Sequence, residues 1–404
     1  MKLVITKKGI NYLLTLAIVI WYTVPIVQAR GGMLPVAALL VLWFLTSDIN
    51  KAFRCMSSIL PCLVMLLVLS IWLLYGTKFY GGIDTVYFAV SVLLMFIPGI
   101  LFWYHVDDLT PLKRNILIFV FFAGLLYGAI NTYIVLEEYP IASRLMATSE
   151  GDIYSEMGAG GFGFAYSVML AFPFLIEVFK SNKNKILKLL YLFMIVFFIM
   201  TIIKCEYTTC LLLLIFGVAI YFLYRSNKLI GMILLVVAVM FFSMGEQLGE
   251  MILDLADLLS DTEVISVRLK DLANAILNED MNTLESSRYD LYMTSVDGFL
   301  SNPFVGTGFA DDIITGGHST ILDTLSLYGI FGLIAVVLPF AKGIKKTRNT
   351  ISNNATYKTV TLTFWVLTIL NPTVYIYQLG VIIFFMVPIG LNIKNDEPSI
   401  QTAD

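Results

Sequence analysis

Long apolar segments separated by short polar loops recur along almost the whole chain. Each is roughly 18–25 residues long, the length at which a helix crosses the hydrocarbon core of a bilayer. Only helices and closed barrels satisfy their backbone groups in lipid. The pattern predicts an all-α polytopic membrane protein with about twelve transmembrane helices. The predicted spans are residues 10–29, 33–47, 57–75, 85–105, 115–136, 155–179, 187–203, 208–224, 229–245, 319–341, 359–373 and 375–391.

One polar segment, residues 246–318, is much longer than the other loops. Its sequence predicts two amphipathic helices and a glycine-rich loop, FVGTGFADDIITGG. One apolar stripe comprises Leu248, Met251, Ile252, Leu255, Leu258 and Leu259, and the other Tyr289, Tyr292, Val296, Phe299 and Leu300. We predict an outer-face helical subdomain, inserted before the tenth span of a single transmembrane domain over 1–404. Its apolar faces rest on the bilayer surface or on the bundle.

Composition and charge support a membrane protein and orient it. The chain is 58% hydrophobic and 14% charged, with a mean hydropathy of +0.85, whereas soluble domains are about a quarter charged. If the N-terminus is cytoplasmic, 19 of the 26 Lys and Arg residues lie on inner segments, as the positive-inside rule requires. The reverse orientation breaks the rule in nearly every loop. We therefore predict that both chain ends are cytoplasmic.

Basic residues on the acidic outer face have no topological reason to be there. We interpret five of them as candidate anion-binding residues: Arg144, Lys204, Arg268, Lys270 and Arg288. The alternative is that each pairs with a neighbouring acid as a solvated surface bridge, which contributes little.

The other chemistry-bearing residues are sparse. Four cysteines do not make a disulfide framework, and we favour a buried role over a bridge for Cys205 and Cys210. Two histidines far apart, without grouped cysteines or carboxylates, predict no zinc site. No phosphate-binding loop or dinucleotide fingerprint occurs. The sequence thus predicts no metal, no cofactor and no nucleic-acid partner.

The stretch GGHSTILDTLSLYG, residues 316–329, joins the long loop to the tenth span. Thr320 and Asp323 fit a capping box with Thr320 as N-cap. His318 would then precede the first turn, where free N–H groups favour a neutral imidazole and attract phosphate. A neutral base beside an anion site suits a lipid-phosphate substrate, and the alternative is a histidine satisfied by loop hydrogen bonds. We interpret His105, at an inner span end, as interfacial.

SSRYDLYMTSVDGFLSNPFVGTG, followed after a short interval by GHSTILDTLSLYGIFG, resembles the signature region of the O-antigen polymerase and ligase superfamily. The matching residues are Arg288, Asn302-Pro303, Gly306, Gly308, His318-Ser319, Leu322, Leu325, Tyr328-Gly329 and Gly332. The family often carries a Ser-Arg pair at the outer start of the eighth span, where this chain has KCEYTTC. Lys204 would supply that charge without the bidentate fork of arginine, and Arg268 or Arg144 would fill the gap.

The resemblance implies a GT-C-like glycosyltransferase of the bacterial plasma (inner) membrane, acting on its outer face. Donor and acceptor would be glycans on undecaprenyl diphosphate, and a chain-length regulator would be a further partner. An acceptor hydroxyl would attack the anomeric carbon with inversion and without metal. His318 would activate the hydroxyl and Arg288 would bind the diphosphate, with support from Asp323, Tyr328 and Glu206.

Three functions share this signature or this topology. We prefer a polymerase of O-antigen or capsular repeat units, because polymerases vary more in sequence and this chain keeps only the core signature. The second is an O-antigen ligase, which moves glycan to the lipid A core in lipopolysaccharide biosynthesis. The third is a lipid-linked oligosaccharide transporter, although the internal repeats and midplane charges typical of transporters are not seen.

Overall fold

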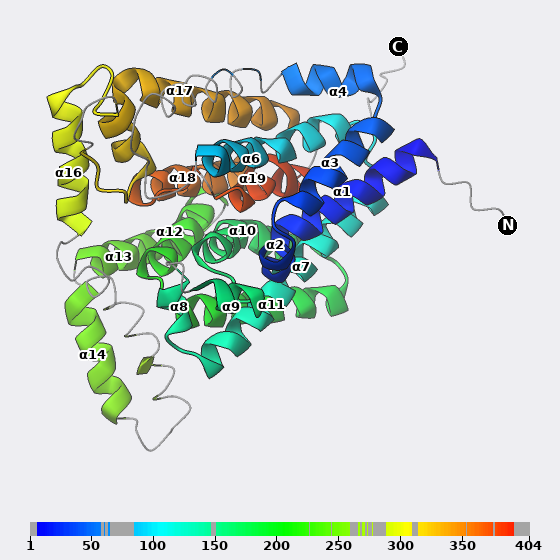
Figure 1. The fold of residues 1–404 in the computed structure, drawn as a ribbon. Coiled ribbons are helices and arrows are strands. Elements are labelled where there is room, and N and C mark those ends of the chain that lie inside the picture. The colour runs from blue at the N-terminus through cyan, green and yellow to red at the C-terminus, as the bar shows by residue number, and fades with distance from the viewer. Residues whose placement is uncertain are drawn as a thin grey trace, which may run out of the picture.

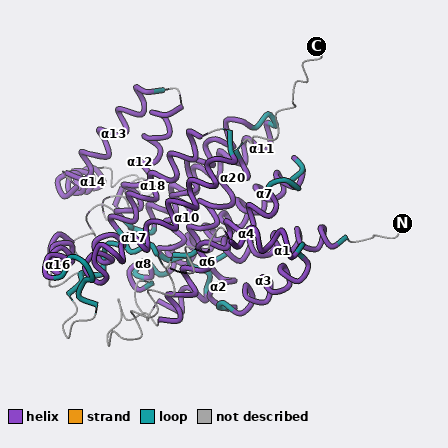
Figure 2. Tube along the Cα trace, turned by 90° about the horizontal axis from the view of Figure 1, so that it is seen from above, coloured by secondary structure: helices purple, strands orange, loops and turns teal. Residues whose placement is uncertain are grey.

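The computed structural model describes residues 6–57, 85–146, 151–225, 227–243, 245–258, 288–308, 314–352, 354–374 and 376–391, with a few single residues between them. The regular elements of this described part are helices (Figure 2), and most run side by side as one bundle (Figure 1). The predicted all-α membrane protein is thereby confirmed at the level of its class.

Five described helices are long and apolar enough to cross a membrane: α7 (Pro111–Glu138), α10 (Phe162–Ser181), α11 (Lys185–Lys204), α12 (Thr208–Arg225) and α17 (Thr320–Thr350). A sixth candidate is the pair α1 (Lys7–Thr23) and α2 (Pro25–Gly31), bent by 93°. The bend lies at Pro25, which cannot continue the hydrogen bonding of α1 but suits the first turn of α2.

Other apolar helices occupy most of the other predicted spans. They are α3 (Leu34–Thr46), α6 (Thr85–His105), α13 (Lys228–Ser243), α18 (Asn354–Leu370) and the run formed by α19 (Gln378–Val381), η4 (Ile382–Met386) and α20 (Val387–Gly390). The predicted span 57–75 lies almost entirely outside the described residues. The predicted start of the sixth span at residue 155 is replaced by the short α9 (Asp152–Glu156), and α10 begins at Phe162. The total of twelve spans stays a prediction.

One part of the hydrophobic core lies between α6, α17, α18 and the last helical run, and another part is built around the largely buried α10. Residues Ile382–Met386 widen into a π-helical turn whose side chains are all buried. The Phe384 ring packs against Phe96 at 5.5 Å and against Phe340 at 6.4 Å. By contrast, α11 and α13 expose many apolar side chains, as expected of lipid-facing helices.

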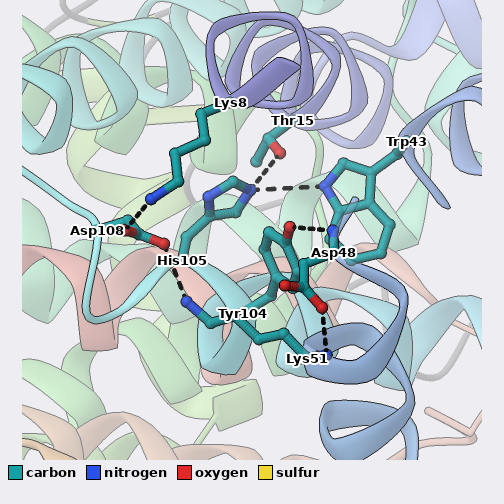
Figure 3. Close-up of polar contacts among 8 residues, drawn as sticks. All are labelled: Lys8, Thr15, Trp43, Asp48, Lys51, Tyr104, His105 and Asp108. Carbon is teal, nitrogen blue, oxygen red and sulfur yellow. Dashed lines mark hydrogen bonds and ion pairs between the residues drawn. The ribbon is translucent and has the colours of Figure 1, made fainter. Parts of the chain in front are cut away.

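Predicted inner segments from distant parts of the chain meet in a cluster of polar contacts (Figure 3). Asp108 accepts hydrogen bonds from Lys8 at 3.1 Å and from Lys51 at 2.9 Å. These donors hold the pKa of Asp108 below its usual value, the Lys51 hydrogen bond most of all. In Figure 1 the start of α1 lies on one side of the bundle, and α16 (Arg288–Ser301) lies on the other. This separation agrees with the predicted topology. That the side with the start of α1 is cytoplasmic stays a prediction.

His105 belongs to the same cluster but is buried rather than interfacial. Its Nε2 atom lies 2.9 Å from the Thr15 hydroxyl oxygen and accepts from Trp43 Nε1 at 3.5 Å (Figure 3). The ring therefore joins α1, α3 and α6, which is a structural role.

Candidate functional site

The N-terminal end of α17 begins with a side-chain cap. Ser319 is the N-cap, and its hydroxyl oxygen accepts from the Leu322 N–H at 3.1 Å. The prediction of Thr320 as the N-cap is therefore wrong by one residue. Thr320 is the first helical residue, and its hydroxyl accepts from the Thr373 N–H at 2.6 Å. This bond ties the start of α17 to the chain that follows α18.

Asp323 organises the loop that precedes α17. Its side chain is buried, with the residue only 1% exposed. One carboxylate oxygen accepts from Ser295 Oγ at 2.6 Å, from Thr315 Oγ1 at 3.2 Å and from the Gly317 N–H at 3.1 Å. The other accepts from the Ser319 N–H at 2.6 Å, so the carboxylate reaches back as predicted. Asp323 thereby fixes residues 315–319 and joins α16 to α17.

The backbone donors at this helix end are largely used inside the protein. The Thr320 N–H donates to the Asn371 carbonyl at 3.2 Å, and Leu322, Gly317 and Ser319 donate as described above. The buried carboxylate of Asp323 occupies the position in which an external anion would profit from the helix end. The expected capture of phosphate by the α17 N-terminus is thus not supported, and any diphosphate must be held by basic side chains.

His318 lies between two residues that Asp323 fixes. It is partly exposed, whereas Ser319 beside it is fully buried. Gly317 has a φ of +74°, a left-handed conformation that glycine adopts without a steric penalty. The backbone on both sides of His318 is therefore held in place while the residue itself stays partly exposed.

The sequence predicts one span over residues 319–341, but the structure shows that this helix is interrupted. Gly329 has φ 63° and ψ −165°, which interrupts α17 between Tyr328 and Ile330. The loop over 303–308 compensates the interruption. The Thr307 N–H donates to the Ser326 carbonyl at 2.7 Å, and the Ile330 N–H donates to the Pro303 carbonyl at 2.9 Å. Two of the backbone groups near the interruption are thus satisfied by this loop.

This loop explains several residues of the signature. A Cβ atom at Gly306 would collide with the backbone at Leu327 and Tyr328, and one at Gly329 would collide with the backbone of Phe304. The glycines are therefore required for close backbone packing. Tyr328 is buried next to this contact, so its role is structural support.

Helix α16 packs across the outer part of α17 through small residues. Ser295 and Gly298 are buried, whereas Leu300 of the predicted apolar stripe is 64% exposed. The Tyr292 hydroxyl donates to the Leu370 carbonyl at 2.8 Å, which braces the end of α18. The bundle therefore does not cover Leu300, and the prediction that the apolar stripe rests on the bundle or on the bilayer stays a prediction at this residue. Arg288 begins this helix, and its side chain lies outside the described residues.

A second group of predicted residues gathers at the turn between α11 and α12. Lys204 forms an ion pair with Glu137 at 3.4 Å, the alternative considered for each outer basic residue. Glu206 occupies the turn with a positive φ of 57°. The Tyr207 hydroxyl donates to the Ser143 carbonyl at 2.9 Å. Arg144 follows Ser143 in α8 (Ala142–Leu145), so its backbone lies beside this turn.

The side chain of Arg144 lies outside the described residues, as does the whole of Arg268. Lys270, like Lys204, has an acidic partner, Asp257 at 2.9 Å. Cys205 and Cys210 are buried and unbridged, as favoured from the sequence. Burial raises the pKa of the Cys205 thiol to about 12, so it is not a nucleophile at neutral pH.

The start of α10 connects the loop that precedes α17 with the turn between α11 and α12. Phe162 stacks on Tyr207 with ring centroids 4.0 Å apart. One turn later the Tyr166 hydroxyl donates to Asn371 Oδ1 at 3.0 Å, and the Asn371 carbonyl accepts from the Thr320 N–H. Sequence reasoning missed Tyr166 and Asn371, for which the only signal was the Asn-Pro-Thr that ends α18. The start of α10 therefore contacts both Tyr207, in the α11–α12 turn, and Asn371, which is hydrogen-bonded to the start of α17.

No family model, curated protein or solved structure matches the chain. Within the described ranges, no three His, Cys, Asp or Glu residues are grouped as metal ligands. Functional assignment accordingly relies on the residues and their geometry.

Proposed function

We propose that the protein is a glycosyltransferase that polymerises lipid-diphosphate-linked saccharide units at the outer face of the plasma membrane. One observation carries the proposal. Two parts of the signature region, residues 303–308 and 314–319, pack against the N-terminal half of α17, and His318 in the second part is partly exposed. A histidine positioned in this way at a lipid boundary suits proton transfer to or from an amphipathic substrate.

The proposed reaction needs one base and one anion-binding group. His318 accepts the proton of an acceptor hydroxyl as its oxygen bonds to the anomeric carbon of the donor. The bond from that carbon to the lipid diphosphate breaks, and the diphosphate leaves with the electron pair. Arg288, at the start of α16, neutralises this leaving group. The proton carried by His318 returns to solvent.

Asp323 is a positioning residue in this scheme and not the base. Four donors surround its buried carboxylate, which leaves little capacity to accept a substrate proton. Its hydrogen bonds to the Gly317 and Ser319 N–H groups fix the backbone on either side of His318. Glu206 lies at the turn between α11 and α12, with Lys204.

The broken helices favour one alternative, a transporter of the same lipid-linked glycans. The 93° bend after α1, the interruption at Gly329 and the π turn in η4 are features that transporters place at substrate sites. Purified protein in liposomes decides between the two functions. A transporter moves labelled lipid-linked saccharide between leaflets without changing its length, whereas a polymerase lengthens it.

The proposed function is tested in a deletion strain by analysis of its lipid-linked glycans. Single repeat units without longer chains are expected, since a polymerase acts before chains form. Long chains that are not joined to lipid A would instead indicate a ligase. Unchanged glycans in all fractions would exclude both activities.

A further inference from the structure

Two helices cross the outer end of the bundle, but only one of them is covered by it. Both α14 (Gly245–Leu258) and α16 run across the direction of the bundle helices, and α14 extends past the edge of the bundle (Figures 1 and 2). Helix α16 is held by α17 and α18, through Ser295 and Tyr292. Helix α14 follows α13 directly, since α13 ends at Ser243.

Helix α14 has three distinct faces. One face packs on the protein: Ala256 is fully buried, and its carbonyl accepts from Ser266 Oγ at 2.8 Å. A second face is acidic and exposed, and carries Glu250, Asp254 and Asp257. The third is apolar and exposed, with Met251 at 66%, Leu255 at 46% and Leu258 at 80% exposure. The spacing of four and three residues aligns these three side chains in one stripe.

The neighbouring surface indicates what covers this stripe. On α13, Met232, Ile233, Val236 and Val239 are exposed and apolar, as on a lipid-facing span. A single residue separates α13 from α14. A helix that turns sideways there starts at the boundary between hydrocarbon and water. Its apolar stripe continues the lipid-facing surface of α13, and its acidic face is of the kind that stays in water.

We propose that α14 is an interfacial anchor, with Met251, Leu255 and Leu258 inserted in the outer leaflet of the bilayer. The helix lies in the membrane plane, and the acidic face points to water. Because that face carries no basic residue among Gly245–Leu258, the anchor relies on apolar burial and not on anionic headgroups. The anchor holds the outer subdomain on the membrane, independently of whether the protein transfers glycans.

Spin labels on single cysteines test this placement in full-length protein reconstituted in phosphatidylcholine nanodiscs. The native cysteines are first replaced by alanine or serine. Labels go on Met251→Cys, Leu255→Cys and Leu258→Cys, with Glu250→Cys and Asp257→Cys on the neighbouring acidic face and Val236→Cys as the lipid reference. Accessibility is measured to oxygen, which partitions into lipid, and to a water-soluble nickel chelate.

The three apolar-face labels should resemble Val236→Cys, with high oxygen and low nickel accessibility, at a depth of roughly 5–10 Å. The acidic-face labels should show the reverse. Two results would overturn the proposal. Equal nickel accessibility on both faces places the stripe in water, and low accessibility to both reagents means that the bundle or a second copy of the chain covers it. Each mutant is a surface substitution, and a symmetric size-exclusion peak verifies its fold.

Discussion

Replacing Asp323 with asparagine should loosen the loop that carries His318 without disturbing the rest of the bundle. The substitution keeps the shape of the side chain but replaces one acceptor oxygen with an amide donor. If the amide nitrogen takes the position near Ser319, its hydrogens face the Ser319 N–H, which loses its 2.6 Å bond. In the other orientation the amide faces Gly317, Ser295 and Thr315, and the Gly317 N–H loses its partner.

Either orientation leaves one buried backbone donor unpaired, which costs about 2 kcal/mol. That corresponds to about a 30-fold increase in the open population of the loop. Hydrogen exchange of the purified protein should show it as faster exchange of the amides in residues 314–319, with α7 and α10 unchanged. Asp297→Asn, an exposed carboxylate on α16, is the matched control and should change nothing. Loop protection equal to that of the wild type in Asp323→Asn would refute this account of the carboxylate.

Three further substitutions test other parts of the structure. Gly329→Ala should prevent a monodisperse preparation, because the new Cβ collides with the backbone of Phe304. Gly32 has similar backbone angles but open space around it, so Gly32→Ala should lower stability in thermal melting only by the backbone strain of about 1–3 kcal/mol. Glu177→Gln should lower stability by about 1–3 kcal/mol in the same assay, because the arginine that ends α12 loses its counter-charge; an unchanged melting temperature would contradict this. Asp108→Asn should lower the melting temperature slightly at pH 7. Because the pKa of Asp108 is lowered, its contribution to stability is full above about pH 4 and is lost as the pH falls further. The difference in melting temperature between wild type and mutant should therefore vanish in acid. A difference that stays constant with pH would exclude the carboxylate as its source.

The apolar spans could be predicted from the sequence because segment length and hydropathy alone decide whether a helix suits the bilayer. The bend after α1 was also within reach, since a proline follows Val24. The interruption at Gly329 was not. It exists because the backbone of 303–308 supplies its hydrogen bonds, and no local pattern reports a partner so far along the chain.

The candidate site shows the same division. The importance of Asp323 could be inferred from its position in a capping pattern. Ser319 and Thr320 are both residue types that cap helices, and Thr320 instead bonds to Asn371 and Thr373, which local sequence does not indicate. The satisfied donors at the start of α17 could not be foreseen, because a distant carbonyl on the α18 side takes one of them. The apolar face of α14 was predicted, but its position beyond the bundle edge comes from the structure (Figure 1).

The most direct test of glycosyl transfer at His318 uses purified protein in nanodiscs, a lipid-diphosphate-linked repeat unit and a gel of product lengths. Wild-type protein should build chains from the repeat unit. His318→Ala should slow chain growth by about a hundredfold or more, while donor binding and the hydrogen-exchange protection of residues 314–319 stay normal. Chain growth by His318→Ala at the wild-type rate would contradict the proposal and leave His318 with a structural role only.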